Sequence, residues 1–183
     1  MIKYIRQILF LMLALAISSQ LFAQLPMKFT PGAELKPSDN MIVTKAGERM
    51  LIPDTKISLI PPEHYMFSKD LKSFIHPTTS SSIQISEIIG TSYIMVSKGL
   101  SPEYLLEQGF VFKEKLDIKT NNGYDGYLYI LGFSNKGVDY ERLMLLAGDY
   151  HNTIWANVSY PFVSKKYLFE PLKESLLTAQ FTK

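Results

Sequence analysis

The 183-residue sequence contains no cysteine. This absence excludes disulfide bonds, thiolate nucleophiles, cysteine-ligated metals and a cysteine-linked lipid anchor, so the fold has to be stabilised by packing. Long runs of positive charge are also missing, because the longest basic clusters are pairs such as Lys165-Lys166. Nucleic-acid and acidic-membrane binding rest on clustered cations, and neither partner is therefore expected.

The N-terminal segment has the order of a secretory signal peptide. Two cations, Lys3 and Arg6, precede an apolar stretch over residues 8–17, and small and polar residues follow up to Ala23 and Gln24. The apolar stretch is shorter than the ~20 residues of a membrane-spanning helix. We expect cleavage between Ala23 and Gln24 and a periplasmic or secreted product without stable membrane insertion. An uncleaved N-terminal anchor is the alternative.

Cleavage would change the net charge of the chain. The sequence has 19 Lys and Arg residues and 17 Asp and Glu residues, and the expected signal peptide contains two of the cations and none of the carboxylates. The mature chain would therefore have a net charge of zero. Its length is sufficient for one domain with a substantial core.

The mature chain divides into a leader and a regular domain. Residues 24–54 are rich in proline, lysine and turn formers and predict an extended leader with one short strand at 41–44. Residues 55–183 predict a single domain. It begins with strands at 57–60 and 83–88, separated by a polar connection between Met66 and Ser82.

A short helix is predicted over residues 102–108. Ser101 can cap it, Pro102 suits its first position, and Gly109 stands where a C-terminal glycine is expected. A further turn or two of helix is expected within residues 91–98.

Four strands with turn residues between them predict an antiparallel meander. In the first strand, Lys113 and Lys115 alternate with apolar residues, which predicts one wet face. The second strand is apolar on both faces and predicts a central position. The four segments are 110–119, 124–133, 138–147 and 153–160.

The C-terminal segment 164–181 predicts an amphipathic helix that Pro171 kinks or starts. Helices before and after a meander with a two-sided central strand predict an α+β domain, a three-layer α/β/α sandwich around an antiparallel sheet.

Several segments of this domain resemble the PsbP-like superfamily, which includes photosystem extrinsic subunits, a Ran-binding nuclear import factor and bacterial exported proteins of unknown role. The resemblance is one of pattern and spacing over residues 55–181, and it implies the same α/β/α sandwich. It implies no catalytic residues, since the superfamily is generally not enzymatic. The matching segments are 57–65, 82–85, 106–110, 122–127 and 148–150, followed by Tyr160-Pro161.

Motifs for catalysis or cofactors are absent from the sequence. The three histidines, His64, His76 and His151, are not spaced as metal ligands on one helix, and we interpret them as solvated loop residues. The run 78–82 is rich in hydroxyl groups, but no motif orients a base beside it. We therefore expect no catalytic residue, no metal and no cofactor. A catalytic triad assembled only in space stays open as an alternative.

Aromatic residues gather on the predicted meander and supply the candidate functional surface, for a ligand or a partner: Tyr124, Tyr127, Tyr140 and Trp155. Strands favour the same residue types for packing alone. Our preferred hypothesis is a non-enzymatic exported accessory or scaffold protein that acts through a protein–protein surface, with another envelope protein as its partner. The alternative is a periplasmic protein that binds a small apolar ligand or lipid. An undetected hydrolase is a third hypothesis.

Overall fold

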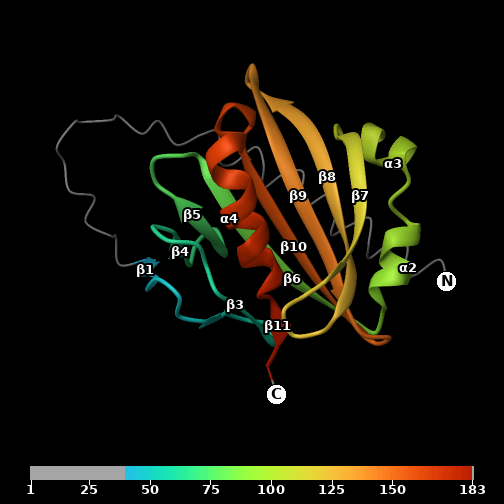
Figure 1. Ribbon diagram of the computed structural model, residues 1–183, viewed down its shortest axis with the longest axis horizontal. Coiled ribbons are helices and arrows are strands. Elements are labelled where there is room, and N and C mark those ends of the chain that lie inside the picture. The colour runs from blue at the N-terminus through green and yellow to red at the C-terminus, as the bar shows by residue number, and fades with distance from the viewer. Residues whose placement is uncertain (1–39, 183) are drawn as a thin grey trace.

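The computed structural model describes residues 40–182. The expected signal peptide, its cleavage site at Ala23 and Gln24 and most of the expected leader lie outside this part. A large antiparallel sheet dominates the fold (Figure 1), in the order β1-β4-β5-β6-β10-β9-β8-β7. Its strands are β1 Met41–Val43, β4 Met66–Ser68, β5 Ser73–His76, β6 Ser81–Ile89, β7 Val111–Lys119, β8 Asp125–Asn135, β9 Val138–Gly148 and β10 Asn152–Pro161.

A small sheet and helices cover the large sheet. The small sheet has the order β11-β3-β2, formed by Gln180–Phe181, Ile57–Leu59 and Met50–Leu51. Helices α2 (Tyr93–Lys98) and α3 (Pro102–Glu107) pack on one face of the large sheet. Helix α4 (Lys165–Leu177), which follows the 3-10 turn η2 (Phe162–Ser164), packs on the other face with the small sheet. The α+β, three-layer prediction is confirmed.

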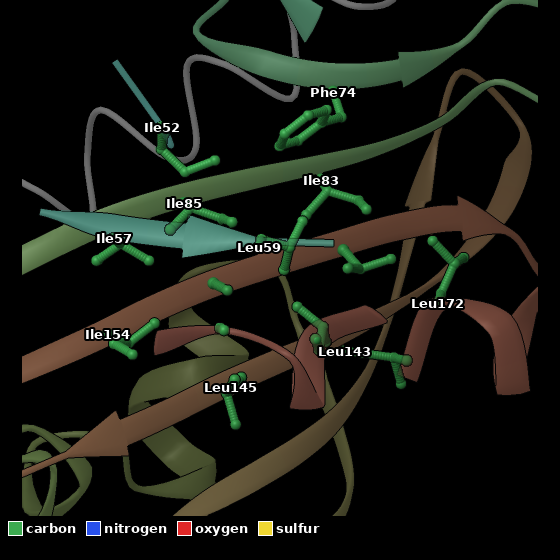
Figure 2. Packing of buried hydrophobic residues seen from close by; sticks show 14 of the residues in the cluster. Ile52, Ile57, Leu59, Phe74, Ile83, Ile85, Leu143, Leu145, Ile154 and Leu172 are labelled. Atoms are coloured by element: carbon green, nitrogen blue, oxygen red, sulfur yellow. The ribbon is translucent and has the colours of Figure 1, made fainter. Parts of the chain in front are cut away.

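Two hydrophobic cores lie on the two faces of the large sheet. The first core joins the small sheet and α4 to the large sheet, and Figure 2 shows Ile57 and Leu59 of β3 close to Ile83 and Ile85 of β6. The second core joins α2 and α3 to the opposite face. No helix among residues 40–182 is long and apolar enough to cross a membrane.

Strand β8 contributes to both cores, as its two-sided apolar pattern predicted. Leu128 and Ile130 point into the first core, whereas Tyr129 and Leu131 point into the second. All four side chains are buried.

The expectation of one wet face on β7 was wrong, because this strand contains a β-bulge. The register shifts between Phe112 and Glu114, so the alternation of side chains changes face at Lys113. Phe112 therefore packs against the second core, and Leu116 packs against the first. Lys113 does not point freely into water, because it bonds a buried carboxylate described below.

Several short strands were not predicted. The expected polar connection between Met66 and Ser82 contains the hairpin β4–β5, where Phe67 and Phe74 are buried and meet edge to face. The short strand expected at 41–44 is present as β1, which pairs with β4. The strand at 50–51, which also falls in the predicted leader, was not expected, and it pairs with β3. The helix predicted over 164–181 ends at Leu177, and the expectation was wrong beyond this point, because β11 pairs with β3.

The local helix signals are confirmed. The hydroxyl of Ser101 accepts a hydrogen bond from the Tyr104 amide and caps α3. Gly109 follows that helix with φ +83°, a conformation that costs glycine little. Ser92 caps α2 in the same way. Pro171 lies inside α4 and does not end it.

Candidate binding groove and neighbouring polar clusters

An open groove of about 720 Å³ runs beside α4. One wall is α4 itself, and the other is the segment that follows β3. His76, the last residue of β5, and Asn121, in the turn between β7 and β8, also line it. The lining residues are Ile60, Pro61, Pro62, Glu63, His64, Tyr65, His76, Asn121, Tyr167, Leu168, Pro171, Leu172, Glu174, Ser175 and Thr178.

The wall after β3 is held by backbone and side-chain bonds. Pro61 and Pro62 end the strand because proline cannot donate to a sheet ladder. His64 then adopts a φ of +66°, which reverses the chain toward Tyr65. The Tyr65 ring is buried, and its hydroxyl shares a hydrogen bond of 2.5 Å with Ser81. Burial raises the pKa of Tyr65 to about 12, so this group stays protonated.

Helix α4 is tied to the same wall. The Ser175 hydroxyl donates to the Ile60 carbonyl at 2.7 Å, and the Ile60 amide donates to the Thr178 hydroxyl at 2.8 Å. The side chains of Ser175 in α4 and of Thr178, which caps the end of that helix, thus satisfy both backbone groups of Ile60, which would otherwise lack a partner where the strand ends. The groove therefore has two walls of fixed spacing.

The structure brings together two histidines that the sequence analysis treated as unrelated loop residues. The rings of His64 and His76 are 6.3 Å apart and nearly perpendicular, and Tyr65 lies 5.2 Å from His76. Burial, and then the proximity of His64, lower the pKa of His76. His151 lies apart from them, in the turn before β10. Within residues 40–182, no group of three or more His, Cys, Asp or Glu side chains could hold a metal ion.

The groove has an acidic character. Glu63 and Glu174 line it, and no lysine or arginine is found among the described residues of its lining. Tyr167 adds an exposed aromatic ring at the α4 wall. The prolines and aromatic rings supply flat apolar surface between the two carboxylates.

The four aromatic residues proposed from sequence do not form one surface. Trp155 is 1% exposed in the second core. Tyr127 packs at the edge of the same core, with the Lys115 ammonium 3.6 Å from its ring centroid. Tyr124 lies against the first core, edge to face with an aromatic ring of β11. Tyr140 stacks on the neighbouring ring of β8, away from both.

A buried carboxylate cluster was missed from the sequence. Glu141 has no exposed side-chain area, and it accepts hydrogen bonds from Lys113 (2.9 Å), Lys165 (3.1 Å) and the Tyr160 hydroxyl (2.5 Å). Burial would raise the pKa of Glu141, but these three hydrogen bonds outweigh it, and the pKa is lowered. Phe162 covers the Lys113 ammonium at 4.5 Å. The cluster joins β7, β9, β10 and the start of α4.

Gly132 makes room for this cluster. It pairs with Glu141 across β8 and β9, and a Cβ added to it would lie 3.0 Å from Cε of Lys113. The Lys113 chain crosses β8 at the position where a side chain is missing. A glycine within an apolar strand, beside a strand that carries a lone Glu, was the signal in the sequence.

A second polar cluster lies under α2. The Ser97 and Tyr129 hydroxyls share a hydrogen bond of 2.7 Å, and the Lys115 ammonium donates to Ser97 at 2.9 Å. A serine beside a lysine amine is the element that Ser–Lys hydrolases use. Here Ser97 and Tyr129 are buried, and neither lines the groove. The arrangement links α2 to β7 and β8.

Comparisons with known proteins address the fold. No family model and no curated protein matches the chain. The solution structure of cyanobacterial PsbP from Synechocystis is similar at a TM-score of 0.53 and 8% identity, covering 85% of this chain and 99% of that one. The fold is PsbP-like.

Two further solved structures resemble this chain less closely. One is LpqN of Mycobacterium tuberculosis, described as involved in cell envelope biogenesis, with a TM-score of 0.46 and 11% identity over 69% of this chain and 83% of that one. The other, from Bacteroides thetaiotaomicron, has a TM-score of 0.46 and 17% identity over 76% of this chain and 50% of that one.

Proposed function

We propose that the chain is an exported, non-enzymatic accessory protein that binds an extended, basic segment of a partner protein in the α4 groove. The observation that carries this proposal is the groove itself, which is open, acidic and lined by prolines and aromatic rings. Export rests on the signal-peptide order of residues 1–23. The partner is another protein of the cell envelope.

The lining suits an extended peptide. Grooves lined by aromatic rings bind extended and polyproline II segments, because such segments lose little conformational entropy on binding. Tyr167 and the pair Pro61-Pro62 would contact the apolar parts of such a segment. Glu63 and Glu174 would favour lysine or arginine on it through charge complementarity.

The two walls are preorganised for binding. The Ser175 and Thr178 bonds to Ile60 hold α4 at a fixed distance from the opposite wall, so little ordering has to occur when a segment binds. The exposed ring of Tyr167 is the exception, and it can close over a bound chain.

A small apolar ligand is the second candidate for the same groove. Its volume of about 720 Å³ is in the range of small-molecule sites, which are about 300–1,000 Å³. The aromatic face of the meander, which first suggested such a ligand, is filled by α2, α3 and the buried Trp155. Binding of a basic peptide and binding of a small apolar ligand are therefore both tested at the groove.

The experiment uses the mature chain and fluorescein-labelled 12-residue peptides that contain proline and lysine, with acidic peptides of matched length as controls. We expect fluorescence anisotropy to show binding of the basic peptides alone, weakened about tenfold by Tyr167→Ala or Glu174→Lys. Glu107→Lys, an exposed charge reversal on α3, is the matched control and should leave binding unchanged.

Two results would contradict the peptide proposal. Equal binding of acidic and basic peptides would remove the charge argument. Displacement of a bound hydrophobic dye by fatty acids, sensitive to Tyr167→Ala while no peptide binds, would assign the groove to the apolar ligand.

A further inference from the structure

Arg142 is a buried cation without a carboxylate partner in the part of the chain that the structure describes. It is 7% exposed, and its Nε donates a hydrogen bond of 3.0 Å to the Ser159 hydroxyl. Its guanidinium carbon lies 4.7 Å and 5.2 Å from the ring centroids of Phe110 and Phe133. None of the salt bridges among residues 40–182 includes Arg142. Buried charges are normally paired, because their desolvation is costly.

The fold places Arg142 at one end of a polar strip on the large sheet. Directly opposite residues of antiparallel strands share a face. Arg142 is opposite Ser159, and Ser159 is opposite Ser82. The neighbouring row on the same face contains Asn157, Gln84 and Ser73. The strip thus crosses β9, β10, β6 and β5, a width of about 14 Å at ~4.8 Å per strand.

This strip differs from the rest of its sheet face. Farther along the same face, Trp155, Met144 and Tyr129 form the second core beneath α2 and α3. The polar side chains of the strip do not belong to that core. Asn157 and Arg142 are nevertheless buried, at 7% exposure each. Polar side chains that are buried in a sheet require polar partners.

A buried serine hydroxyl at the far end of the strip also lacks a hydrogen-bond partner. The Ser73 side-chain oxygen is buried and has no hydrogen-bond partner, and the residue is 2% exposed. A buried hydroxyl without a partner costs about 1–3 kcal/mol. The strip therefore carries, on β9, a cation without a carboxylate partner among residues 40–182 and, on β5, a hydroxyl without a hydrogen-bond partner.

We propose that this strip binds an anionic ligand with hydroxyl groups, such as a phosphorylated or carboxylated sugar. Its phosphate or carboxylate accepts hydrogen bonds from the Arg142 guanidinium, which is held flat by the two phenylalanine rings and by Ser159. The hydroxyl groups of the ligand bond Asn157 and reach Ser73. Phosphate and carboxylate share the chemistry that arginine recognises.

The site is independent of the proposed peptide groove. It lies on the face of the large sheet that α2 and α3 share, whereas the groove lies beside α4 on the other face. No residue of the strip lines the groove. Failure of one proposal leaves the other intact.

The test measures thermal stabilisation of the mature chain by inorganic phosphate, acetate, glucose 6-phosphate and glucose, with chloride at equal ionic strength as the baseline. We expect glucose 6-phosphate to raise Tm most, inorganic phosphate and acetate less, and glucose not at all, since a ligand that binds only the folded state stabilises it. A comparison of phosphate with acetate distinguishes the two anion classes.

Three variants assign the effect to the strip. Arg142→Gln should abolish the shift in Tm, and Ser73→Ala should reduce the shift for the sugar phosphate but not for inorganic phosphate. Ser159→Ala, which keeps the cation and loses its positioning bond, should weaken binding about fivefold by titration calorimetry. Lys173→Gln, at a partly exposed lysine of α4 that pairs with Glu170, is the control.

Three results would overturn the proposal. The first is that the anions do not stabilise the chain beyond chloride, and the second is that their effect survives Arg142→Gln while that variant remains folded by circular dichroism. The third result concerns the two carboxylates of residues 24–39, Glu34 and Asp39. If Glu34→Gln or Asp39→Asn creates anion binding that the unaltered chain lacks, the partner of Arg142 belongs to the chain itself.

Discussion

Replacing Lys113 and Lys165 by methionine tests the interpretation of the Glu141 cluster. Methionine keeps the apolar stem of lysine and removes the charge, so packing changes little. Each lysine is about 40% exposed, at 38% and 42%, which reduces the contribution of either bond alone. We expect each single variant to lose about 1–2 kcal/mol of unfolding free energy.

The double variant should lose more unfolding free energy than either single variant. It leaves Glu141 buried with the Tyr160 hydroxyl as its only partner of those described above, and a buried charge that loses its counter-ions costs about 3–5 kcal/mol. The matched control is Lys119→Met on the same strand. Lys119 pairs with Asp125 at 2.7 Å, but both side chains are 64% exposed, so the loss should stay within about 0.5 kcal/mol.

The pH dependence gives a sharper test. In the unaltered protein the pKa of Glu141 is lowered, so its stabilisation is complete above the ordinary value of 4.5 and is lost as the pH falls through the folded pKa. In the double variant, burial, which raises the pKa, is no longer opposed by the lysines. The pKa of Glu141 should then exceed its ordinary value, and stability should fall as the pH rises through it.

Urea denaturation of the unaltered protein and the four variants between pH 4 and pH 7 measures both effects. The reasoning is refuted if the double variant loses no more stability than Lys119→Met, or if its pH dependence has the same sign as that of the unaltered protein. From sequence alone, Lys113 was expected on a wet face, where its replacement by alanine would cost at most about 0.5 kcal/mol.

Three other expectations can be checked directly. Ile130→Ala and Leu131→Ala, which open cavities in different cores, should each cost about 2–5 kcal/mol in chemical denaturation, and a neutral result for either would show that its face is open. In an NMR titration His76 should have a pKa below 6.5 that rises in the His64→Ala variant, and its contribution to stability should be present above pH 6.5 and decline as the pH falls; an unchanged midpoint in His64→Ala would contradict the proximity argument. N-terminal sequencing of exported material should begin at Gln24, and an intact precursor in a membrane pellet would contradict cleavage.

The meander and α3 could be predicted because their signals are local. Asn122-Gly123 marks the turn between β7 and β8, and Ser101, Pro102 and Gly109 mark both ends of α3. Such signals depend on residues that are close in sequence, so they can be recognised without knowing the tertiary structure.

The short strands have no such signals. Met50–Leu51 and Gln180–Phe181 have two residues each, too few for a period, and they are strands because β3 lies between them. The bulge at Lys113 was hidden for a related reason. One extra residue shifts which side chains of β7 face each core. A lysine is expected to be exposed unless a buried partner such as Glu141 is known.

The candidate site was the least predictable part. The groove joins residues 60–65 to α4, and its walls are fixed by the bond from Ser175 to Ile60, 115 residues apart. Three of the four aromatic residues chosen from sequence pack in or against the cores, as Trp155 shows, and Tyr140 belongs to neither core. A functional surface made by the approach of distant segments has no single motif to reveal it.

The small sheet has a consequence for the order in which a nascent chain can fold. Strand β3 is the middle strand of this sheet, and one of its two neighbours, β11, comes from residues 180–181. The Thr182 hydroxyl also donates to the Lys56 carbonyl, across 126 residues. The first core cannot close until this C-terminal segment has been synthesised, and contacts of such long range form slowly.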